Sequence, residues 1–238
     1  DTWVNWCEGL GTVLANDEVK EGYSERGNFP VEQKKMRQWS LRITAYSERL
    51  LADLETVEWS DSLKEMQKNW IGKSKGAIVN FKVENKNESI EVFTTRPDTI
   101  FGVSFIVISP EHSLVKKITI DSQRNTINQY CKEASLRSER DRQSDAKTVS
   151  GVFTGSCAIH PFTKMKVPIW IADYVLASYG TGAIMAVPCG DQRDWLFAKH
   201  YEIDIINIFK DINISKSAFE GKDAYINNSE FLDNLSCD

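Results

Sequence analysis

Hydrophobic and polar residues alternate in two neighbouring segments in the first half of the chain. Residues 77–83 (AIVNFKV) and 89–93 (SIEVF) place β-branched or aromatic side chains at alternate positions. A two-residue period is typical of a half-buried strand. Asn85, Lys86 and Asn87 stand between the segments and suit a tight turn, so the pattern predicts a β-hairpin.

Three further apolar runs are short and are bounded by Gly or Pro. They are residues 105–108, 166–171 and 183–187. Short runs of this kind indicate buried strands. The sequence therefore predicts a β-rich α+β fold, in which a few helices surround a sheet core.

A different period is found over residues 31–54. Apolar residues recur there at three- and four-residue steps, which predicts an amphipathic helix with its apolar face in the core. These residues are Met36, Trp39, Ile43, Tyr46, Leu50, Leu51 and Leu54. Residues 114–147 are polar and charged, and we expect helix there with a mobile loop over 135–145.

These patterns divide the chain into four consecutive parts. Residues 1–30 are rich in Gly, Asn and charge and form a loop-rich module. A linker helix and a connecting strand follow over 31–72, and the main domain covers 73–215. Residues 216–238 carry only a weak pattern and are interpreted as a C-terminal linker or tail.

The composition is that of an ordinary globular chain. Its 238 residues, 41% hydrophobic and 26% charged, suffice for one large domain or one domain with a small appendage. A formal net charge of -5 argues against nucleic-acid binding by bulk electrostatics. No apolar run approaches the roughly 18 residues of a membrane span, and the start lacks a signal-peptide pattern. Because Asp1 begins within structured sequence, we interpret the chain as a piece of a larger protein and expect a monomer without a membrane partner.

Five cysteines are scattered along the chain, at Cys7, Cys131, Cys157, Cys189 and Cys237. None belongs to a CxxC pair, so the sequence indicates neither a disulfide framework nor a complete zinc site. A reducing cytoplasmic location is the simplest expectation.

Two segments far apart in the sequence hold the candidate chemistry. Residues 94–99 (TTRPDT) supply hydroxyls and a carboxylate, and residues 179–188 (YGTGAIMAVP) supply a small apolar wall that leads to Asp191 and Asp194. These groups suit the capture of a small amino acid by its ammonium group and the placement of water beside its ester bond. The sequence therefore favours a proofreading hydrolase.

Asp191 and Asp194 also have a purely structural interpretation. They precede a helix-like pattern over residues 195–201, so Asp191 suits the N-cap and Asp194 the third helical position. A capping box and favourable helix-dipole charges, worth about 1 kcal/mol, would explain the pair. The functional interpretation adds that a carboxylate at a helix start beside a Gly-rich turn can face a ligand cation.

Several motifs, in their order along the chain, closely resemble bacterial leucyl-tRNA synthetases. They are residues 38–39 (QW), 43–46 (ITAY), 66–74 (MQKNWIGKS), 94–99, and 179–188 followed by 191–194 (DQRD). The resemblance spans most of the chain and corresponds to the family's inserted editing (CP1) domain and the linker that enters it, without the ATP-binding signatures. It implies a closed β-barrel core of the type shared by valyl-, isoleucyl- and leucyl-tRNA synthetase editing domains, with surrounding helices, a linker helix and a degenerate zinc-ribbon-like module at residues 1–30.

The resemblance implies post-transfer editing. The 3′ end of tRNA(Leu) carrying a noncognate amino acid, such as isoleucine, valine, methionine or norvaline, would enter this domain, where water cleaves the aminoacyl ester. One methylene in an apolar pocket discriminates by only roughly 1 to 3 kcal/mol, so a second, hydrolytic site multiplies selectivity. The resemblance places leucine ligation, with its ATP and magnesium, in a catalytic domain outside this chain, so no cofactor is expected here.

The resemblance also implies roles for individual residues. Asp194 would pair with the substrate ammonium, with Asp191 in support. Thr99 stands where the family keeps its leucine-excluding threonine, which fills the space that a γ-branched side chain needs. The other implied substrate-binding residues are Arg96 at a phosphate, Tyr179 near the terminal adenosine, and Met185 and Val187 in the side-chain pocket.

Thr94 and Thr95 would orient the attacking water or stabilise charge on the carbonyl oxygen, an effect that can be worth several kcal/mol. Neither is a strong base. The family usually has a His before the first Asp of the pair, but Gly190 stands there in this chain, so the general base stays open. Cys7 is the one cysteine kept of the family's expected set, and we predict that the small module binds no zinc and is held by packing.

Alternatives to these roles remain open. An aspartic-type hydrolase would use Asp98 with Asp191 or Asp194 as a proton-sharing pair, although Ile100 replaces the Gly of an Asp-Thr-Gly motif. A non-catalytic binding module would use residues 180–182 (GTG) only as a turn. A dinucleotide loop there would lack its third Gly. An Arg before Pro, as at Arg96, can equally be a structural partner of Asp98.

Overall fold

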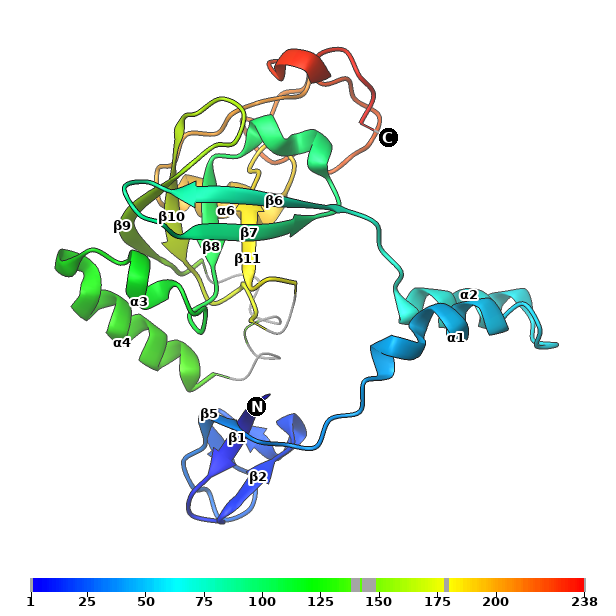
Figure 1. Ribbon diagram of the computed structural model, residues 1–238, viewed down its shortest axis with the longest axis vertical. Helices are drawn as coiled ribbons and strands as arrows, with labels where there is room; N and C mark the ends of the chain where they lie inside the picture. Colours follow the sequence, from blue (N-terminus) through cyan, green and yellow to red (C-terminus); the bar gives the residue numbers. More distant parts are fainter. Residues whose placement is uncertain (1, 138–141, 143–148, 178–179, 238) are drawn as a thin grey trace. The chain divides into compact units, whose positions relative to one another are not determined.

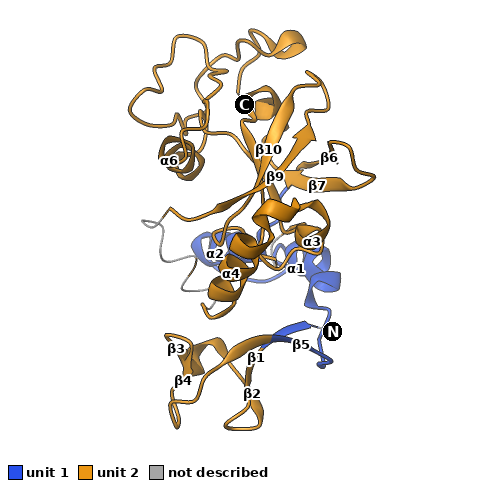
Figure 2. Ribbon diagram, turned by 90° about the vertical axis from the view of Figure 1, so that its left-hand side faces the viewer, with its two compact units in different colours: residues 1–4, 34–75 blue, residues 5–33, 76–238 orange. Residues whose placement is uncertain are grey.

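The computed structural model describes residues 2–137, 142, 149–177 and 180–237. These residues form two compact units (Figure 2). One unit consists of residues 1–4 and 34–75, and the other consists of residues 5–33 and 76–238. The expected mobile loop over 135–145 falls largely outside the described residues.

The larger unit contains a six-stranded sheet in the order β11-β8-β10-β9-β6-β7 (Figure 1). Its strands are β6 (Ala77–Val83), β7 (Ser89–Thr94), β8 (Phe105–Ile108), β9 (Val152–Ile159), β10 (Lys166–Ile171) and β11 (Ala183–Ala186). Only β8 and β10 pair in parallel, and the other neighbours are antiparallel. The end strands β7 and β11 lie beside each other, so the sheet closes into a nearly complete barrel.

The predicted hairpin and apolar strands are confirmed. β6 pairs with β7 from Ala77 opposite Thr94 to Lys82 opposite Ser89, and Asn85 supplies a left-handed residue (φ 57°) at the turn. Figure 1 shows this hairpin crossing the direction of β8 and β11. β8 is buried at every position because it lies inside the sheet and is covered on both faces. The predicted β-rich α+β class with a barrel core is therefore confirmed.

One strand, β9, was missed by the sequence analysis. Its inward positions are Thr154, Ser156 and Ala158, which lack the large apolar side chains that mark an alternating strand. The hydroxyls are satisfied inside the barrel, where Thr154 Oγ1 donates to the carbonyl of Ile169 at 2.7 Å. Gly155 (φ 79°) lies at a bulge opposite β10, and a Cβ there would come 2.2 Å from Ile120. Tertiary pairing therefore defines this strand more than its own pattern does.

Helices cover the barrel. α3 (Val115–Ile118), η4 (Asp121–Gln123) and α4 (Arg124–Ser135) lie against β9 (Figure 1), which confirms helix after residue 114. η3 (Pro97–Gly102) joins β7 to β8, and α6 (Gln192–His200) follows β11. α6 packs through Phe197, whose ring stacks on Phe105 with centroids 5.0 Å apart. In the described part of the chain, no helix is long and apolar enough to cross a membrane.

The C-terminal segment has little regular structure apart from η5 (Glu230–Leu232), but it is not loose. Ala224, Ile226 and Cys237 belong to the barrel's hydrophobic core together with Ile208 and Phe209. Phe209 pairs with Ile226 through an isolated bridge, and the Phe219 ring lies edge-on to the Phe209 ring. The segment interpreted as a tail therefore contributes to the core of the barrel.

Residues 5–33 form a small loop-rich module. It contains β2 (Thr12–Leu14), η1 (Asn16–Glu18), β3 (Val19–Lys20), β4 (Tyr23–Ser24) and parts of β1 (Thr2–Cys7) and β5 (Glu32–Met36). Its core is Cys7, Leu14 and Val31, with Leu10 and Val19 packed against them. The thiol of Cys7 is fully buried in this apolar cluster, as is common for a structural cysteine.

The helix predicted over residues 31–54 is wrong in its first half. β5 (Glu32–Met36) joins the sheet with β1 and β2, residues 37–42 form no regular element, and η2 (Ile43–Tyr46) leads into α1 (Ser47–Asp53). The expected core packing is also wrong, since Trp39 is fully exposed and only Leu54 of the predicted face is buried. α2 (Asp61–Ile71) follows and ends at Gly72, a left-handed C-cap.

Candidate functional site

Asp191 caps the N-terminus of α6, as the sequence predicts. Asp191 is the N-cap, and its Oδ1 accepts hydrogen bonds from the backbone N–H groups of Arg193 (2.8 Å) and Asp194 (3.0 Å). Asp194 occupies the third helical position, but the reciprocal half of the capping box is wrong. Its carboxylate turns to the chain after β11 instead, where Oδ2 accepts the backbone N–H of Val187 at 2.8 Å.

Asp194 is a carboxylate held in a poorly solvated place. Only 6% of the residue is exposed, and its Oδ1 accepts a hydrogen bond from the Tyr174 hydroxyl at 3.3 Å. Burial and, after it, the nearby Asp191 carboxylate raise the pKa of Asp194 to about 8, against the lowering effect of its two hydrogen bonds and of Arg193. A cation entering this place would favour the ionised carboxylate.

Asp194 lies at the edge of a cleft of about 900 Å³. The lining residues come from the end of β7, the segment after β10, β11, the first turn of α6 and the C-terminal segment. They are Phe93, Thr94, Thr95, Tyr174, Val175, Leu176, Ile184, Met185, Asp191, Gln192, Arg193, Asp194, Leu196 and Glu220. Five residues predicted from sequence therefore meet in one cleft, namely Thr94, Thr95, Met185, Asp191 and Asp194.

The TTRPDT segment turns sharply at the end of β7. Thr94 Oγ1 accepts the backbone N–H of Arg96 at 3.0 Å, and Thr99 Oγ1 donates to the carbonyl of Arg96 at 2.8 Å. The Arg96 guanidinium forms a forked ion pair with Asp98, with Nη2 to Oδ2 at 2.8 Å. The structure thus contains the internal Arg96–Asp98 pair that the sequence analysis left open as an alternative.

Three of the described residues that were predicted from sequence do not line the cleft. Thr99 is buried in η3, Val187 is buried after β11 and contributes its N–H to Asp194, and Arg96 is engaged by Asp98. Tyr179 lies outside the described residues. Thr95 differs from Thr94, because its side chain is exposed at the cleft.

Sequence reasoning missed Tyr174 and Glu220. Tyr174 belongs to the segment after β10, and Glu220 comes from the weakly patterned C-terminal segment. Glu220 Oε1 accepts the backbone N–H of Gln192 at 3.2 Å, and Gln192 Oε1 accepts that of Ala218 at 2.9 Å. No local pattern marks either residue, because both reach α6 only through the tertiary fold.

The position before Asp191 offers no imidazole. Of the described residues that line the cleft, none is a histidine. A Cβ on Gly190 would meet the Phe209 ring at 3.4 Å, an ordinary contact, so the backbone itself does not demand glycine. The neighbouring Cys189 is buried, and burial raises the pKa of its thiol to about 11, which makes it a poor nucleophile.

The alternatives gain no support from this geometry. Asp98 is bound by Arg96 and is absent from the cleft lining, so it does not share a proton with Asp191 or Asp194. Gly180 (φ 59°) and Gly182 (φ 71°) form a left-handed turn that enters strand β11, whereas a dinucleotide loop enters a helix. Among the residues that the structure describes, no group of three His, Cys, Asp or Glu side chains could hold a metal ion.

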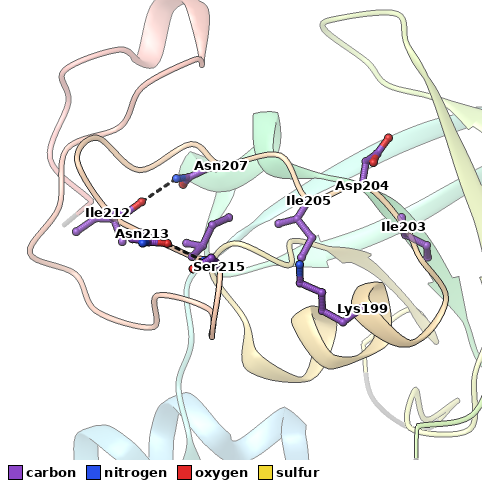
Figure 3. Close-up of a pocket in the computed structure, with 9 residues that line it drawn as sticks. Lys199, Ile203, Asp204, Ile205, Asn207, Ile212, Asn213 and Ser215 are labelled. Carbon is purple, nitrogen blue, oxygen red and sulfur yellow. Dashed lines mark hydrogen bonds between the residues drawn. The ribbon is translucent and has the colours of Figure 1, made fainter.

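A second hollow, of about 550 Å³, lies at the other end of α6 (Figure 3). Lys199 and four isoleucines line it, and Figure 3 shows Asp204 pointing away from the other labelled side chains. Its amides are used internally, since Asn207 Nδ2 donates to the carbonyl of Ile212 at 2.9 Å and Asn213 Oδ1 accepts the N–H of Ser215 at 2.9 Å. This hollow has volume but no converging hydroxyls or carboxylates.

Comparisons with known proteins agree on one family. Residues 68–238 match the family model described as leucyl-tRNA synthetase, editing domain. The chain is 60% identical over 233 residues to a leucine–tRNA ligase of Christiangramia forsetii, covering 98% of this chain and 24% of that protein. It is 55% identical over 243 residues to that of Porphyromonas gingivalis, covering 99% and 26%. The chain thus spans about a quarter of the length of these curated relatives.

A solved structure shows the same fold. The crystal structure of the ternary complex of Agrobacterium radiobacter K84 agnB2 LeuRS, tRNA and LeuAMS matches with a TM-score of 0.69 and 35% sequence identity. The match covers 92% of this chain and 27% of that one. With the family model covering most of the chain, the chain belongs to the leucyl-tRNA synthetase editing-domain family.

Proposed function

We propose that this chain hydrolyses the ester of tRNA(Leu) charged with a noncognate amino acid, as the editing part of a leucyl-tRNA synthetase. The observation that carries the proposal is the buried Asp194 carboxylate at the edge of a cleft lined by threonines and apolar side chains. The cleft is large enough for an aminoacyl group and the sugar that bears it.

Asp194 anchors the substrate by its ammonium group. The fold keeps water away from this carboxylate, and a bound cation compensates for the missing hydration. A charge-assisted contact in such a poorly solvated place is strong and directional. Because the pKa of Asp194 in the folded protein without substrate is about 8, a larger fraction of the carboxyl group is ionised and able to pair with the ammonium as pH rises toward that value. Asp191 supports the anchor by holding the first turn of α6 in place.

Thr95 and Thr94 position the water. The Thr95 hydroxyl is exposed at the cleft, whereas Thr94 also accepts the N–H of Arg96 and so fixes the turn. With no cleft-lining histidine among the described residues, we assign the rate enhancement to positioning and to stabilisation of charge on the carbonyl oxygen. No metal or other cofactor is invoked in this mechanism.

Selection against leucine is assigned to Thr99 and Met185. Thr99 is buried in η3 and does not line the cleft surface, but its bond to the Arg96 carbonyl fixes the direction of its methyl group, which we propose limits the room for a branched side chain. Met185 lines the cleft on β11, and Val187 is buried directly after that strand. An apolar wall of this kind discriminates by roughly 1 to 3 kcal/mol, which a hydrolytic step after synthesis converts into added selectivity.

The proposed partner is the 3′ end of tRNA(Leu). The net charge of -5 is unfavourable for holding RNA on this chain alone, so we propose that most of the tRNA affinity belongs to other parts of a synthetase. Arg96 and Tyr179 are proposed to contact the phosphate and the terminal adenosine. Ligation of leucine with ATP and magnesium would likewise belong outside this chain, in a cytoplasmic, monomeric synthetase.

The proposal is tested by deacylation assays with isoleucyl-tRNA(Leu) and leucyl-tRNA(Leu), for this chain and for the full-length synthetase side by side. We expect the full-length enzyme to release isoleucine and to spare leucine, with the chain alone slower because it binds tRNA weakly. If the full-length enzyme hydrolyses neither substrate, or hydrolyses both equally fast, a selective editing function is contradicted.

A further inference from the structure

Tyr174 is a cleft residue to which the mechanism above gives no part. It follows β10 in the chain, and its hydroxyl donates to Asp194 Oδ1 at 3.3 Å. It thus binds the carboxylate oxygen opposite to the one that accepts the Val187 N–H. Each oxygen of the Asp194 carboxylate is therefore bound by one donor of the fold.

The backbone at Tyr174 is anchored by its neighbour Asp173. Asp173 is buried, its Oδ1 accepts a hydrogen bond from Ser150 Oγ at 2.9 Å, and its Oδ2 pairs with Arg137 Nη1 at 2.6 Å. The backbone N–H of Asp173 donates to the Tyr130 hydroxyl at 3.0 Å. A satisfied buried network of this kind fixes the segment from which Tyr174 projects.

The ring of Tyr174 also has two neighbours on α6. It meets the buried Phe197 ring edge-on, with centroids 5.9 Å apart, and the Arg193 guanidinium lies 5.5 Å from its centroid. Phe197 and Arg193 both belong to α6, the helix that carries Asp194. The packing therefore restricts the Tyr174 side chain before its hydroxyl donates to Asp194, so the hydrogen bond costs little conformational entropy.

We propose that Tyr174 is a positioning residue for editing, whose hydroxyl holds the Asp194 carboxylate in the orientation that receives the substrate ammonium. The inference rests on the proposed function of Asp194 and names the group that prepares it. Tyr174 itself stays protonated, because burial and then the Asp194 carboxylate raise its pKa well above the usual value. It can therefore donate at any pH in which the protein works.

The charged groups around Asp194 set the sign of the expected effect. Asp191 opposes its ionisation from the N-cap of α6, while Arg193 on the same helix favours it, as do the hydrogen bonds from Tyr174 and Val187. Cys189 faces it as a neutral thiol, and Glu220 adds a carboxylate at the cleft. Removing the Tyr174 hydroxyl deletes a donor to the ionised form, so the pKa of Asp194 moves further above neutrality.

The test compares Tyr174→Phe with Tyr201→Phe in the full-length synthetase. Tyr201→Phe also removes one tyrosine hydroxyl, which donates to the Gly151 carbonyl at 2.9 Å. Tyr201 does not line the cleft, so this variant is the matched control. Deacylation of isoleucyl-tRNA(Leu) is measured between about pH 6 and 9, with affinity for a non-hydrolysable isoleucyl-adenosine amide as a second readout. We expect Tyr174→Phe to raise KM and weaken analogue binding about threefold to tenfold at pH 7.

The shape of the pH profile separates positioning from general damage. In Tyr174→Phe the acid limb of kcat/KM should move to higher pH while kcat at saturation stays within about twofold. Tyr201→Phe should follow the unaltered enzyme. A Tyr174→Phe profile that superposes on the unaltered one, or that falls equally at every pH, overturns this inference. An unaltered enzyme that fails to deacylate isoleucyl-tRNA(Leu) overturns the proposed function itself.

Discussion

The two ends of α6 each border a hollow, and they differ in what the fold has done with polar groups. At the start of the helix, Asp191 caps the backbone and Asp194 is buried beside a cleft with a pKa raised to about 8. At the far end, Lys199 and four isoleucines line the hollow, and the amides of Asn207 and Asn213 form hydrogen bonds within their own loop. Both ends of the helix therefore border a hollow, whereas a poorly solvated carboxyl group that a bound cation would ionise is found only at the start, among the described residues that line the two hollows.

This difference indicates how a structural motif becomes a site. An N-cap alone needs one carboxylate, and Asp191 supplies it. Asp194 is turned away from the cap, because the Val187 N–H and the Tyr174 hydroxyl bind its two oxygens, and the residue lines the cleft. The helix start therefore serves the fold through one carboxylate and the ligand through the other.

The largest effect is expected from Asp194→Ala. Loss of the buried anion should lower deacylation of isoleucyl-tRNA(Leu) about 100-fold or more, because the substrate ammonium would lose a charged partner in a poorly solvated place. Steady-state deacylation in the full-length synthetase measures it, and Lys199→Ala at the other end of α6 is the matched control. If Asp194→Ala and Lys199→Ala lower the deacylation rate equally, the functional difference between the two ends of α6 is contradicted.

Removal of the Thr95 hydroxyl should come next. Thr95→Val keeps the shape of the side chain but deletes a donor that is exposed at the cleft, so kcat should fall about 30-fold. Thr94→Val should affect kcat less directly, because the Thr94 hydroxyl already accepts the Arg96 N–H. Single-turnover deacylation measures kcat for both variants. A larger loss of kcat in Thr94→Val than in Thr95→Val would show that Thr94, and not Thr95, positions the water.

Thr99 allows the sieve to be tested in two steps. Thr99→Ser removes the methyl and keeps a hydroxyl for the Arg96 carbonyl, and Thr99→Ala removes both. If the methyl excludes leucine, both variants should hydrolyse leucyl-tRNA(Leu) about tenfold faster than the unaltered enzyme. Release of leucine from purified leucyl-tRNA(Leu) is the measurement. Continued refusal of leucine by both variants would remove Thr99 from the sieve.

A smaller effect is expected on stability. The pKa of Asp194 is about 8 in the folded chain and about 3.9 when unfolded, so the folded state binds more protons between these values and loses stability as pH rises through them. Asp194→Asn removes this dependence. Its free energy of unfolding relative to the unaltered chain should rise by about 2 kcal/mol or more from pH 5 to pH 9.

Urea denaturation at the two pH values measures this difference. Asp191→Asn is the control, because Asn caps a helix about as well as Asp and the residue is exposed. A parallel pH dependence in Asp194→Asn and the unaltered chain would show that Asp194 is not the buried acid that this structure places beside the cleft.

The parts of the fold that sequence predicts are those with local patterns. The hairpin of β6 and β7, the buried β8 and the Asp191 cap follow from alternation, short apolar runs and cap chemistry. β9 escapes because Thr154 and Ser156 face inward and are satisfied by distant carbonyls. The helix predicted before residue 43 fails because Glu32–Met36 pairs in a sheet.

The same division applies to the site. Thr94, Thr95, Met185, Asp191 and Asp194 lie in two recognisable segments, and the barrel brings those segments together. Tyr174 and Glu220 carry no local signal, since each meets α6 through contacts made by residues far away in sequence. Whether a carboxylate is buried, and which oxygen receives which donor, depends on the assembled fold.

The central claim is that Asp194 pairs with the substrate ammonium, and a double-mutant cycle tests it directly. Deacylation is measured for isoleucyl-tRNA(Leu) and N-acetyl-isoleucyl-tRNA(Leu), each with the unaltered synthetase and with Asp194→Ala. If the two charges form one contact, acetylation and Asp194→Ala should each lower kcat/KM about 100-fold, and together they should cost little more than either alone. Losses that multiply to about 10,000-fold would contradict the pairing.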